Sequence, residues 1–242
     1  MNDNEKLSAY SIEILEVEKN DAVTYTFRCS RPDNLFWDTG ANGHFSLELP
    51  TGIKDIDKEF QRHMSILSCG DEPYLEFTTR IRPSASNFKR KLSELRKGDS
   101  IFIYGINNRM PLVREDRNLI FITMGVALST CRPYIREYEK DGRGILSLTC
   151  INIDKKGKSY FQKESVRFSA PRLTFSFSGD RDEFYRAIDN TLLLQKGIYY
   201  LIGSDPFLAD TGRYLLQKGI DSKSIIIDKK YGIEEHLTKM AD

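Results

Sequence analysis

The first half of the chain alternates apolar and polar residues over short segments. Tyr10–Lys19 and Ala22–Cys29 repeat this pattern every two residues, which is the period of a strand with one buried face. Further segments of the same kind follow at residues 44–50, 62–69, 74–82 and 99–106. Turn residues separate these segments, so the pattern predicts a small antiparallel barrel.

One helix interrupts the expected strands. Phe88, Leu92 and Leu95 recur at the spacing of one helical face within residues 86–96. Ser86 is suited to cap the start of this helix, and Gly98 is suited to end it. The helix is therefore expected to begin shortly after the fifth strand.

The second half has a different pattern, with longer apolar segments. Residues 119–125 (LIFITMG) form a continuous apolar run, which is typical of a strand covered on both faces. Strands are expected at 119–125, 145–153, 172–179, 197–203 and 224–228, and helices near 130–140, 159–165, 182–194 and 207–219. This alternation predicts an α/β unit with a mostly parallel sheet. We therefore expect two domains, residues 1–114 and 115–242, divided within the charged segment 113–118.

Composition and charge exclude several classes of function. The 242 residues include 36 Lys and Arg and 35 Asp and Glu, so the formal net charge of +1 offers nucleic acid no general attraction. The N-terminus is polar and acidic, unlike a secretory signal, and the longest mostly apolar stretch (119–131) is shorter than the ~20 residues of a membrane span. The four cysteines form no CxxC pair. We expect a cytoplasmic protein with no nucleic-acid partner, no membrane span and no metal site.

Two segments of the first half carry groups that suit an anionic ligand. Residues 62–65 (RHMS) combine a guanidinium, which binds phosphate through two hydrogen bonds, with a hydroxyl group. Residues 84–86 (SAS) precede the expected helix, whose first N–H groups and dipole favour an anion. An exposed arginine on a strand and an ordinarily capped helix would explain the same residues without a ligand. The candidate residues of this half are Arg62, His63, Met64, Ser65, Thr79, Arg80, Ser84, Ala85 and Ser86.

These segments, in this order, resemble the ferredoxin–NADP(+) reductase superfamily. Residues 62–65 resemble its Arg-x-aromatic-Ser flavin motif, with Met64 at the aromatic position, and residues 84–89 resemble the segment that receives the flavin pyrophosphate. The resemblance implies an N-terminal antiparallel barrel that binds FAD over residues 1–114. It also implies a C-terminal parallel α/β domain that binds a pyridine nucleotide over residues 115–242.

The motifs of the nucleotide half are only partly retained. Residues 124–130 resemble the family's Gly-Gly-x-Gly-Ile-Thr-Pro turn, but Met124 and Ala127 replace two of its glycines. Residues 203–207 resemble its Cys-Gly-Pro-Pro segment, and residues 150–153 its Tyr-x-Asn-Arg segment. The candidate residues implied for this half are Gly125, Ser129, Asn152, Gly203 and Ser204. Lys155, Lys156 and Lys158 would favour a 2′-phosphate, although a lysine run is more often only solvated.

The resemblance implies an enzyme that passes electrons from NADPH or NADH through FAD to a ferredoxin, a flavodoxin or a similar acceptor. No residue is identified as an acid or base, because hydride transfer to flavin requires orientation more than proton transfer. The substituted turn at 124–130 favours a second hypothesis, a flavin-binding or ligand-free regulatory subunit that has lost pyridine-nucleotide binding. It also predicts that any nucleotide binds weakly, because side chains replace glycines beneath the pyrophosphate.

Overall fold

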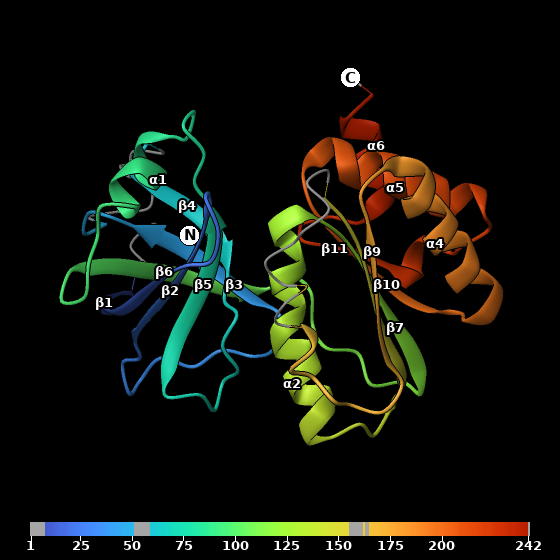
Figure 1. The fold of residues 1–242 in the computed structure, drawn as a ribbon, viewed down its shortest axis with the longest axis horizontal. Helices are drawn as coiled ribbons and strands as arrows, with labels where there is room; N and C mark the ends of the chain where they lie inside the picture. The colour runs from blue at the N-terminus through green and yellow to red at the C-terminus, as the bar shows by residue number, and fades with distance from the viewer. Residues whose placement is uncertain (1–7, 51–58, 155–161, 163–164, 242) are drawn as a thin grey trace, which may run out of the picture. The chain divides into compact units, whose positions relative to one another are not determined.

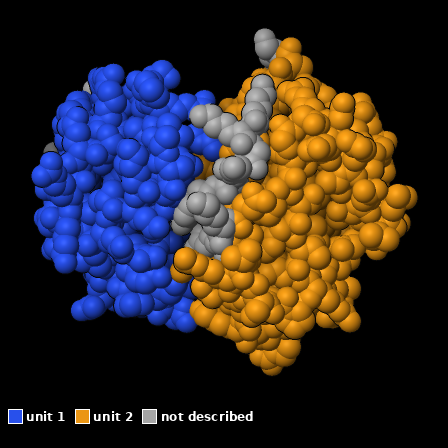
Figure 2. All heavy atoms as spheres, viewed as in Figure 1, with its two compact units in different colours: residues 1–108 blue, residues 109–242 orange. Residues whose placement is uncertain are grey.

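The computed structural model describes residues 8–50, 59–154, 162 and 165–241. The chain forms two compact units, residues 1–108 and 109–242, which Figures 1 and 2 show. The division lies a few residues before the boundary expected after residue 114. Within the described residues, no helix is both long enough and apolar enough to cross a membrane.

The first unit is a six-stranded antiparallel sheet. Its strands are β1 (Ala9–Lys19), β2 (Thr24–Ser30), β3 (Ala41–Ser46), β4 (Gln61–Ser65), β5 (Tyr74–Arg80) and β6 (Ser100–Asn108). They are arranged in the order β4-β3-β6-β1-β2-β5, and every pair is antiparallel. The sheet is barrel-like, with β4 and β5 as its edges, which confirms the expected architecture.

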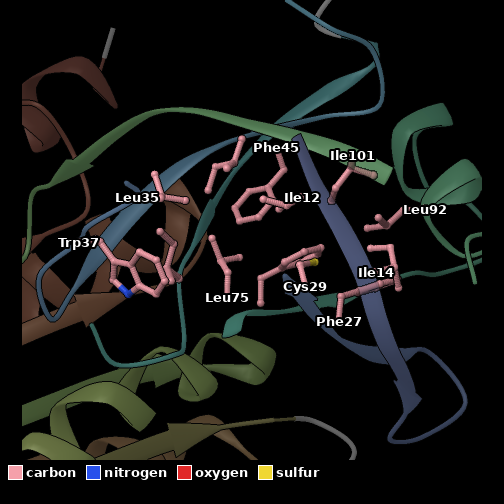
Figure 3. Packing of buried hydrophobic residues seen from close by; sticks show 14 of the residues in the cluster. Ile12, Ile14, Phe27, Cys29, Leu35, Trp37, Phe45, Leu75, Leu92 and Ile101 are labelled. Carbon is pink, nitrogen blue, oxygen red and sulfur yellow. The ribbon is translucent and has the colours of Figure 1, made fainter. Parts of the chain in front are cut away.

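Alternation along the strands places one set of side chains inside this unit. Ile12 and Ile14 of β1 and Phe27 of β2 are fully buried and point toward the same core in Figure 3. Helix α1 (Asn87–Leu92) covers one end of the core, because Phe88 and Leu92 are also fully buried. The helix ends earlier than expected, since a tighter turn follows in which the Leu95 N–H donates to the Leu92 carbonyl (3.3 Å).

The second unit is a five-stranded parallel sheet with helices on both faces. Its strands are β7 (Arg117–Met124), β8 (Ile145–Ile153), β9 (Leu173–Ser178), β10 (Gly197–Ile202) and β11 (Ile225–Ile227), in the order β11-β10-β7-β8-β9. The helical elements are the 3₁₀ turns η1 (Gly125–Cys131) and η2 (Ser222–Ser224) and the helices α2 (Arg132–Lys140), α4 (Arg181–Leu194), α5 (Asp205–Gln217) and α6 (Ile233–Lys239). All pairs are parallel, which confirms the predicted α/β architecture.

The apolar run of β7 serves two cores, one on each face of the sheet. Leu119 and Phe121 pack with the cluster that contains Tyr134 of α2. Ile120 and Ile122 pack with the opposite cluster, which includes residues of α4 and α5. In Figure 1, α2 lies on one side of this sheet and α4 and α5 lie on the other. Burial of both faces explains why the strand shows no polar alternation.

Two expected strands of the first unit differ from the structure. In place of the strand expected at 44–50, β3 spans Ala41–Ser46, and in place of the one expected at 62–69, β4 ends at Ser65 and the chain then crosses toward β5. Ile66 donates its N–H to Ala41 (2.9 Å), whereas Leu67 donates to Glu76 of β5 (2.7 Å). The sequence pattern did not predict α6. The helix expected near 159–165 falls mostly outside the described residues.

Candidate functional site

The candidate residues of the first unit lie on the two edge strands and at the start of α1. β4 contributes residues 62–65, and β5 contributes Thr79, which is buried, and Arg80. Each edge strand has a neighbour in the sheet on one side only. The Leu67–Glu76 hydrogen bond and a second bond from the Glu76 N–H to Ser68 Oγ (3.0 Å) connect the chain after β4 to β5. The segment after β4 therefore joins the two edges.

The side chains of β4 alternate between its two faces. Arg62 and Met64 share one face, and Met64 packs against the core cluster of the unit. His63 points the other way, with its ring 4.9 Å from that of His44 on β3. The His44 ring stacks in turn on Tyr104 of β6 at 5.1 Å. His63 thus belongs to a row of rings across three strands, on the face opposite Arg62.

Positive charge gathers where β4, β5 and α1 meet. Lys89 of α1 donates from Nζ to the carbonyl oxygen of Arg80 at 3.0 Å. Burial, followed by the charges of Arg62, Arg82 and Arg80, lowers the pKa of the Lys89 amine. We call these four side chains the basic cluster. An anion bound among them would offset the mutual repulsion that lowers this pKa.

Helix α1 begins close to the basic cluster without a side-chain cap. Ser86 is the N-cap residue, with extended backbone (φ −61°, ψ 161°), but its hydroxyl makes no capping bond. Its Oγ is buried and has no hydrogen-bond partner among the described residues. Ser84 and Ala85 form the preceding turn, in which the Ala85 N–H donates to the Arg82 carbonyl (2.9 Å). Because buried hydroxyls are normally hydrogen-bonded, the Ser86 Oγ fits a position that contacts a ligand oxygen.

The candidate residues of the second unit gather at the carboxyl edge of its sheet. The strand order proceeds through β7, β8 and β9 in one direction and through β10 and β11 in the other. The point of reversal lies between β7 and β10, and ligands of such sheets bind beyond the carboxyl ends there. Thr123 of β7 pairs with Ile202 of β10, which places Gly125 and the pair Gly203 and Ser204 at neighbouring strand ends.

The turn after β7 retains glycine at a position where the backbone requires it. Gly125 has φ +61°, a left-handed conformation that residues with a side chain adopt at a cost. Met124 has ordinary extended backbone (φ −124°, ψ 118°), and its side chain is 37% exposed. Ser129 is buried and donates from Oγ to the Val126 carbonyl (2.7 Å), which stabilises the turn itself. The turn thus keeps its backbone shape despite the substitutions at Met124 and Ala127.

The other candidate residues of this unit have clear structural roles. Asn152 of β8 is buried, and its Oδ1 accepts a hydrogen bond from Thr123 Oγ1 (2.9 Å). A Cβ atom at Gly203 would lie 2.4 Å from the Phe207 ring, so packing alone requires glycine there. Ser204 is exposed at the start of α5 with extended backbone, and its side chain makes no capping bond. Asn152 is buried and Gly203 has no side chain, so Ser204 is the residue of this group whose side chain is exposed to solvent at the carboxyl edge of the sheet.

Sequence reasoning missed two charged features at the same edge. Asp154 directly follows β8, and its N–H donates to the Ser178 carbonyl at 3.0 Å. Asp205, the first residue of α5, is contacted by Lys229 and His236 from the C-terminal segment. An acidic residue directly after an apolar strand was a usable signal for Asp154, whereas the contacts of Asp205 are long-range. Lys155, Lys156 and Lys158 lie outside the described residues.

Comparison with known proteins identifies the fold. No protein-family model matches the sequence, and a comparison with curated protein sequences found no significant match. Among solved structures, the chain is similar to a ferredoxin NADP+ reductase from Neisseria gonorrhoeae with bound FAD and NADP (TM-score 0.73, 16% identity, 92% of this chain and 99% of that chain). It is also similar to the FAD/NAD-binding domain of nitric oxide dioxygenase from Vibrio cholerae O1 biovar El Tor (TM-score 0.74, 16% identity, 90% and 97%).

A third similar structure is phthalate dioxygenase reductase, described as modular for electron transfer from pyridine nucleotides to [2Fe-2S] (TM-score 0.69, 16% identity, 91% of this chain and 68% of that chain). The three likenesses extend over nine-tenths or more of this chain and include both of its units. They confirm at the level of fold the resemblance to the ferredoxin–NADP(+) reductase superfamily. The chain thus has the two-part fold of these reductases.

Proposed function

We propose that this chain is a flavoprotein oxidoreductase that takes electrons from NADH or NADPH and passes them through FAD to a ferredoxin, a flavodoxin or a similar acceptor. The N-terminal domain (residues 1–114) holds FAD, and the C-terminal domain (residues 115–242) holds the nucleotide. The observation that supports this most strongly is the basic cluster beside the buried Ser86 hydroxyl, within a fold that binds FAD in similar proteins.

Each group of residues has a distinct role in this proposal. Arg62 and Lys89 of the basic cluster bind the flavin pyrophosphate, and Ser86 donates its hydroxyl to a phosphate oxygen. Met64 packs on the flavin ring through its polarizable sulfur. The turn at Gly125 and the start of α5 at Ser204 bind the nucleotide. FAD supplies the redox chemistry, and the side chains orient the two ring systems for hydride transfer.

The purified protein tests this function directly. We expect a yellow protein whose flavin is bleached under anaerobic conditions by NADH or NADPH. Heat should release FAD and not FMN, because the start of α1, with its free N–H groups, suits a pyrophosphate. A colourless protein that cannot be reconstituted with FAD would refute the flavin site. Recovery of FMN alone would refute the assignment of the dinucleotide.

A second candidate function is a flavin-binding regulatory subunit without nucleotide binding. The exposed Met124 side chain at the end of β7 favours it, since the similar family turn has glycine there. This candidate predicts a yellow protein that neither NADH nor NADPH bleaches. The same experiment therefore separates the two functions.

We expect Asp154 to influence the choice between NADH and NADPH. A carboxylate after the second strand of such a sheet can bind the ribose hydroxyls and repels a 2′-phosphate. Asp154→Asn should therefore raise the ratio of NADPH to NADH efficiency by about tenfold, as expected for loss of a nearby like charge. Flavin reduction rates with the two nucleotides measure this ratio. An unchanged ratio at low salt would show that Asp154 lies away from the ribose.

The surface around α1 fits an acidic electron acceptor. Arg90 and Lys91 on α1 and Arg96 and Lys97 after it are all exposed. Arg90→Glu should raise KM for an acidic acceptor such as flavodoxin about tenfold, because complementary charge steers association. Its rate with ferricyanide, a small acceptor that needs no docking surface, is the control. If KM for flavodoxin is the same in both proteins, this face is not the docking surface.

A further inference from the structure

The C-terminal segment contacts the start of α5 at the nucleotide edge. His236 of α6 is 1% exposed, and its Nε2 lies 3.2 Å from the carbonyl oxygen of Asp205. Because a carbonyl oxygen can only accept, the His236 ring carries its proton on Nε2. Lys229, in the link between β11 and α6, places Nζ 2.5 Å from Asp205 Oδ1. The two side chains therefore hold both the backbone and the carboxylate of Asp205.

Packing fixes α6 against α5 so that these contacts persist. Ile233 is buried against Gly212 of α5, because a Cβ atom at Gly212 would lie only 2.4 Å from Ile233 Cδ1. Figure 1 shows α6 beside α5 in this unit. The His236 ring also stacks on Tyr231, with ring centres 6.0 Å apart, and Lys239 Nζ lies 3.8 Å from the centre of the Tyr231 ring. His236 thus has a fixed position and a fixed orientation.

Asp205, which these contacts hold, adjoins exposed residues at the carboxyl edge of the parallel sheet. Gly203 and Ser204 directly precede Asp205, and both are exposed where β10 ends. The Ser204 side chain does not cap α5, so one common local restraint on the start of a helix is missing here. The restraint comes instead from a segment about thirty residues later in the chain. Sequence motifs of the nucleotide half give no indication of it.

We propose that His236 is a positioning residue, which with Lys229 forms a clamp on Asp205 that sets the geometry of the Gly203–Asp205 turn for nucleotide binding. The effect on nucleotide affinity rests on the proposed function, whereas the effect on the turn does not. Without the clamp, the turn samples other conformations, and nucleotide binding must then order it at the expense of affinity. His236 itself does not touch the nucleotide in this proposal.

Three variants of the full-length holoprotein test the clamp. His236→Leu removes the donor, His236→Gln keeps a donor at a position close to that of Nε2, and Thr238→Ala alters an exposed residue of the same helix. Hydrogen exchange of the Leu208 amide, which donates to the Ser204 carbonyl (2.9 Å), should be about tenfold faster in His236→Leu, as for loss of one buried hydrogen bond. The rate should return toward that of the unsubstituted protein in His236→Gln and stay unchanged in Thr238→Ala.

The change in flavin absorbance measures the affinity for NAD⁺ and NADP⁺. This affinity should fall about five- to tenfold in His236→Leu, because one hydrogen bond is lost, and it should recover in His236→Gln. Flavin content should not change. A folded His236→Leu protein with normal exchange at Leu208 would overturn the clamp.

If His236→Leu does not fold, Lys229→Met makes the same test on a partly exposed residue. It should also speed exchange of the Leu208 amide, and normal exchange there would count equally against the clamp. If the unsubstituted protein binds neither nucleotide, the proposed function fails and so does the affinity effect. Exchange of the Leu208 amide still decides the clamp in that case.

Discussion

Replacing Arg62 with alanine should weaken FAD binding about 10- to 150-fold, as expected for loss of a charge-assisted contact worth roughly 1.5–3 kcal/mol. Arg62 lies on the edge strand β4, and its charge is among those that lower the pKa of Lys89. Both observations place its guanidinium within the basic cluster. Flavin affinity, measured by titration of apoprotein with FAD, checks this expectation.

The same variant should not make the apoprotein less stable. The pKa of Lys89 is lower in the folded chain than in the unfolded chain, so between these two values the unfolded chain binds more protons and stability rises with pH. Where Lys89 is protonated in both states, its burial and the neighbouring positive charges destabilise the folded chain, and removing Arg62 reduces this destabilisation. Thermal unfolding of the apoprotein at neutral pH should therefore show no loss of stability in Arg62→Ala.

Arg90→Ala is the matched control for this experiment. It removes one positive charge from the exposed side of α1, away from those that lower the pKa of Lys89. We expect its FAD affinity to match that of the unsubstituted protein. Equal FAD affinity in Arg62→Ala and Arg90→Ala would remove Arg62 from the site.

The sequence predicted the architecture because each half has a clear period. Alternation in residues 10–19 and the continuous run at 119–122 depend on one-sided and two-sided burial, which are local consequences of sheet type. The sequence made no prediction where distant contacts decide. Trp37 lies in a loop, yet it is 7% exposed and donates from Nε1 to the Ser68 carbonyl (2.9 Å), and no periodic pattern precedes it.

The candidate site, too, could be predicted from the sequence only in part. Residues 62–65 and 84–86 are contiguous, so a resemblance to known motifs found them from the sequence. The basic cluster could not be read as a unit, because Arg62 and Lys89 meet only through the packing of β4, β5 and α1. His236 acts on Asp205 from a helix that the pattern did not predict. The apolar pattern of α6 was too short to predict a helix, since α6 spans only Ile233–Lys239.

Replacing Gly125 with valine should reduce nucleotide affinity by at least about tenfold. Gly125 has φ +61°, and a residue with a side chain pays about 1–2 kcal/mol in this conformation, more when it is β-branched. Gly125 is also buried, so the turn has little freedom to relax around the new side chain. If the turn holds the pyrophosphate as proposed, a changed turn would withdraw its backbone from that group. Titration of the holoprotein with NAD⁺ and NADP⁺ measures the loss.

Gly219→Val separates backbone strain from the effect on the site. Gly219 follows α5 with φ +81°, and no atom lies within 4 Å of a Cβ placed there. The two variants therefore share the cost of a left-handed valine, and both should unfold at a lower temperature. Only Gly125→Val should lose nucleotide affinity, because only Gly125 lies where the strand order reverses. Equal affinities in the two variants would mean that nucleotide, if bound, does not contact this turn.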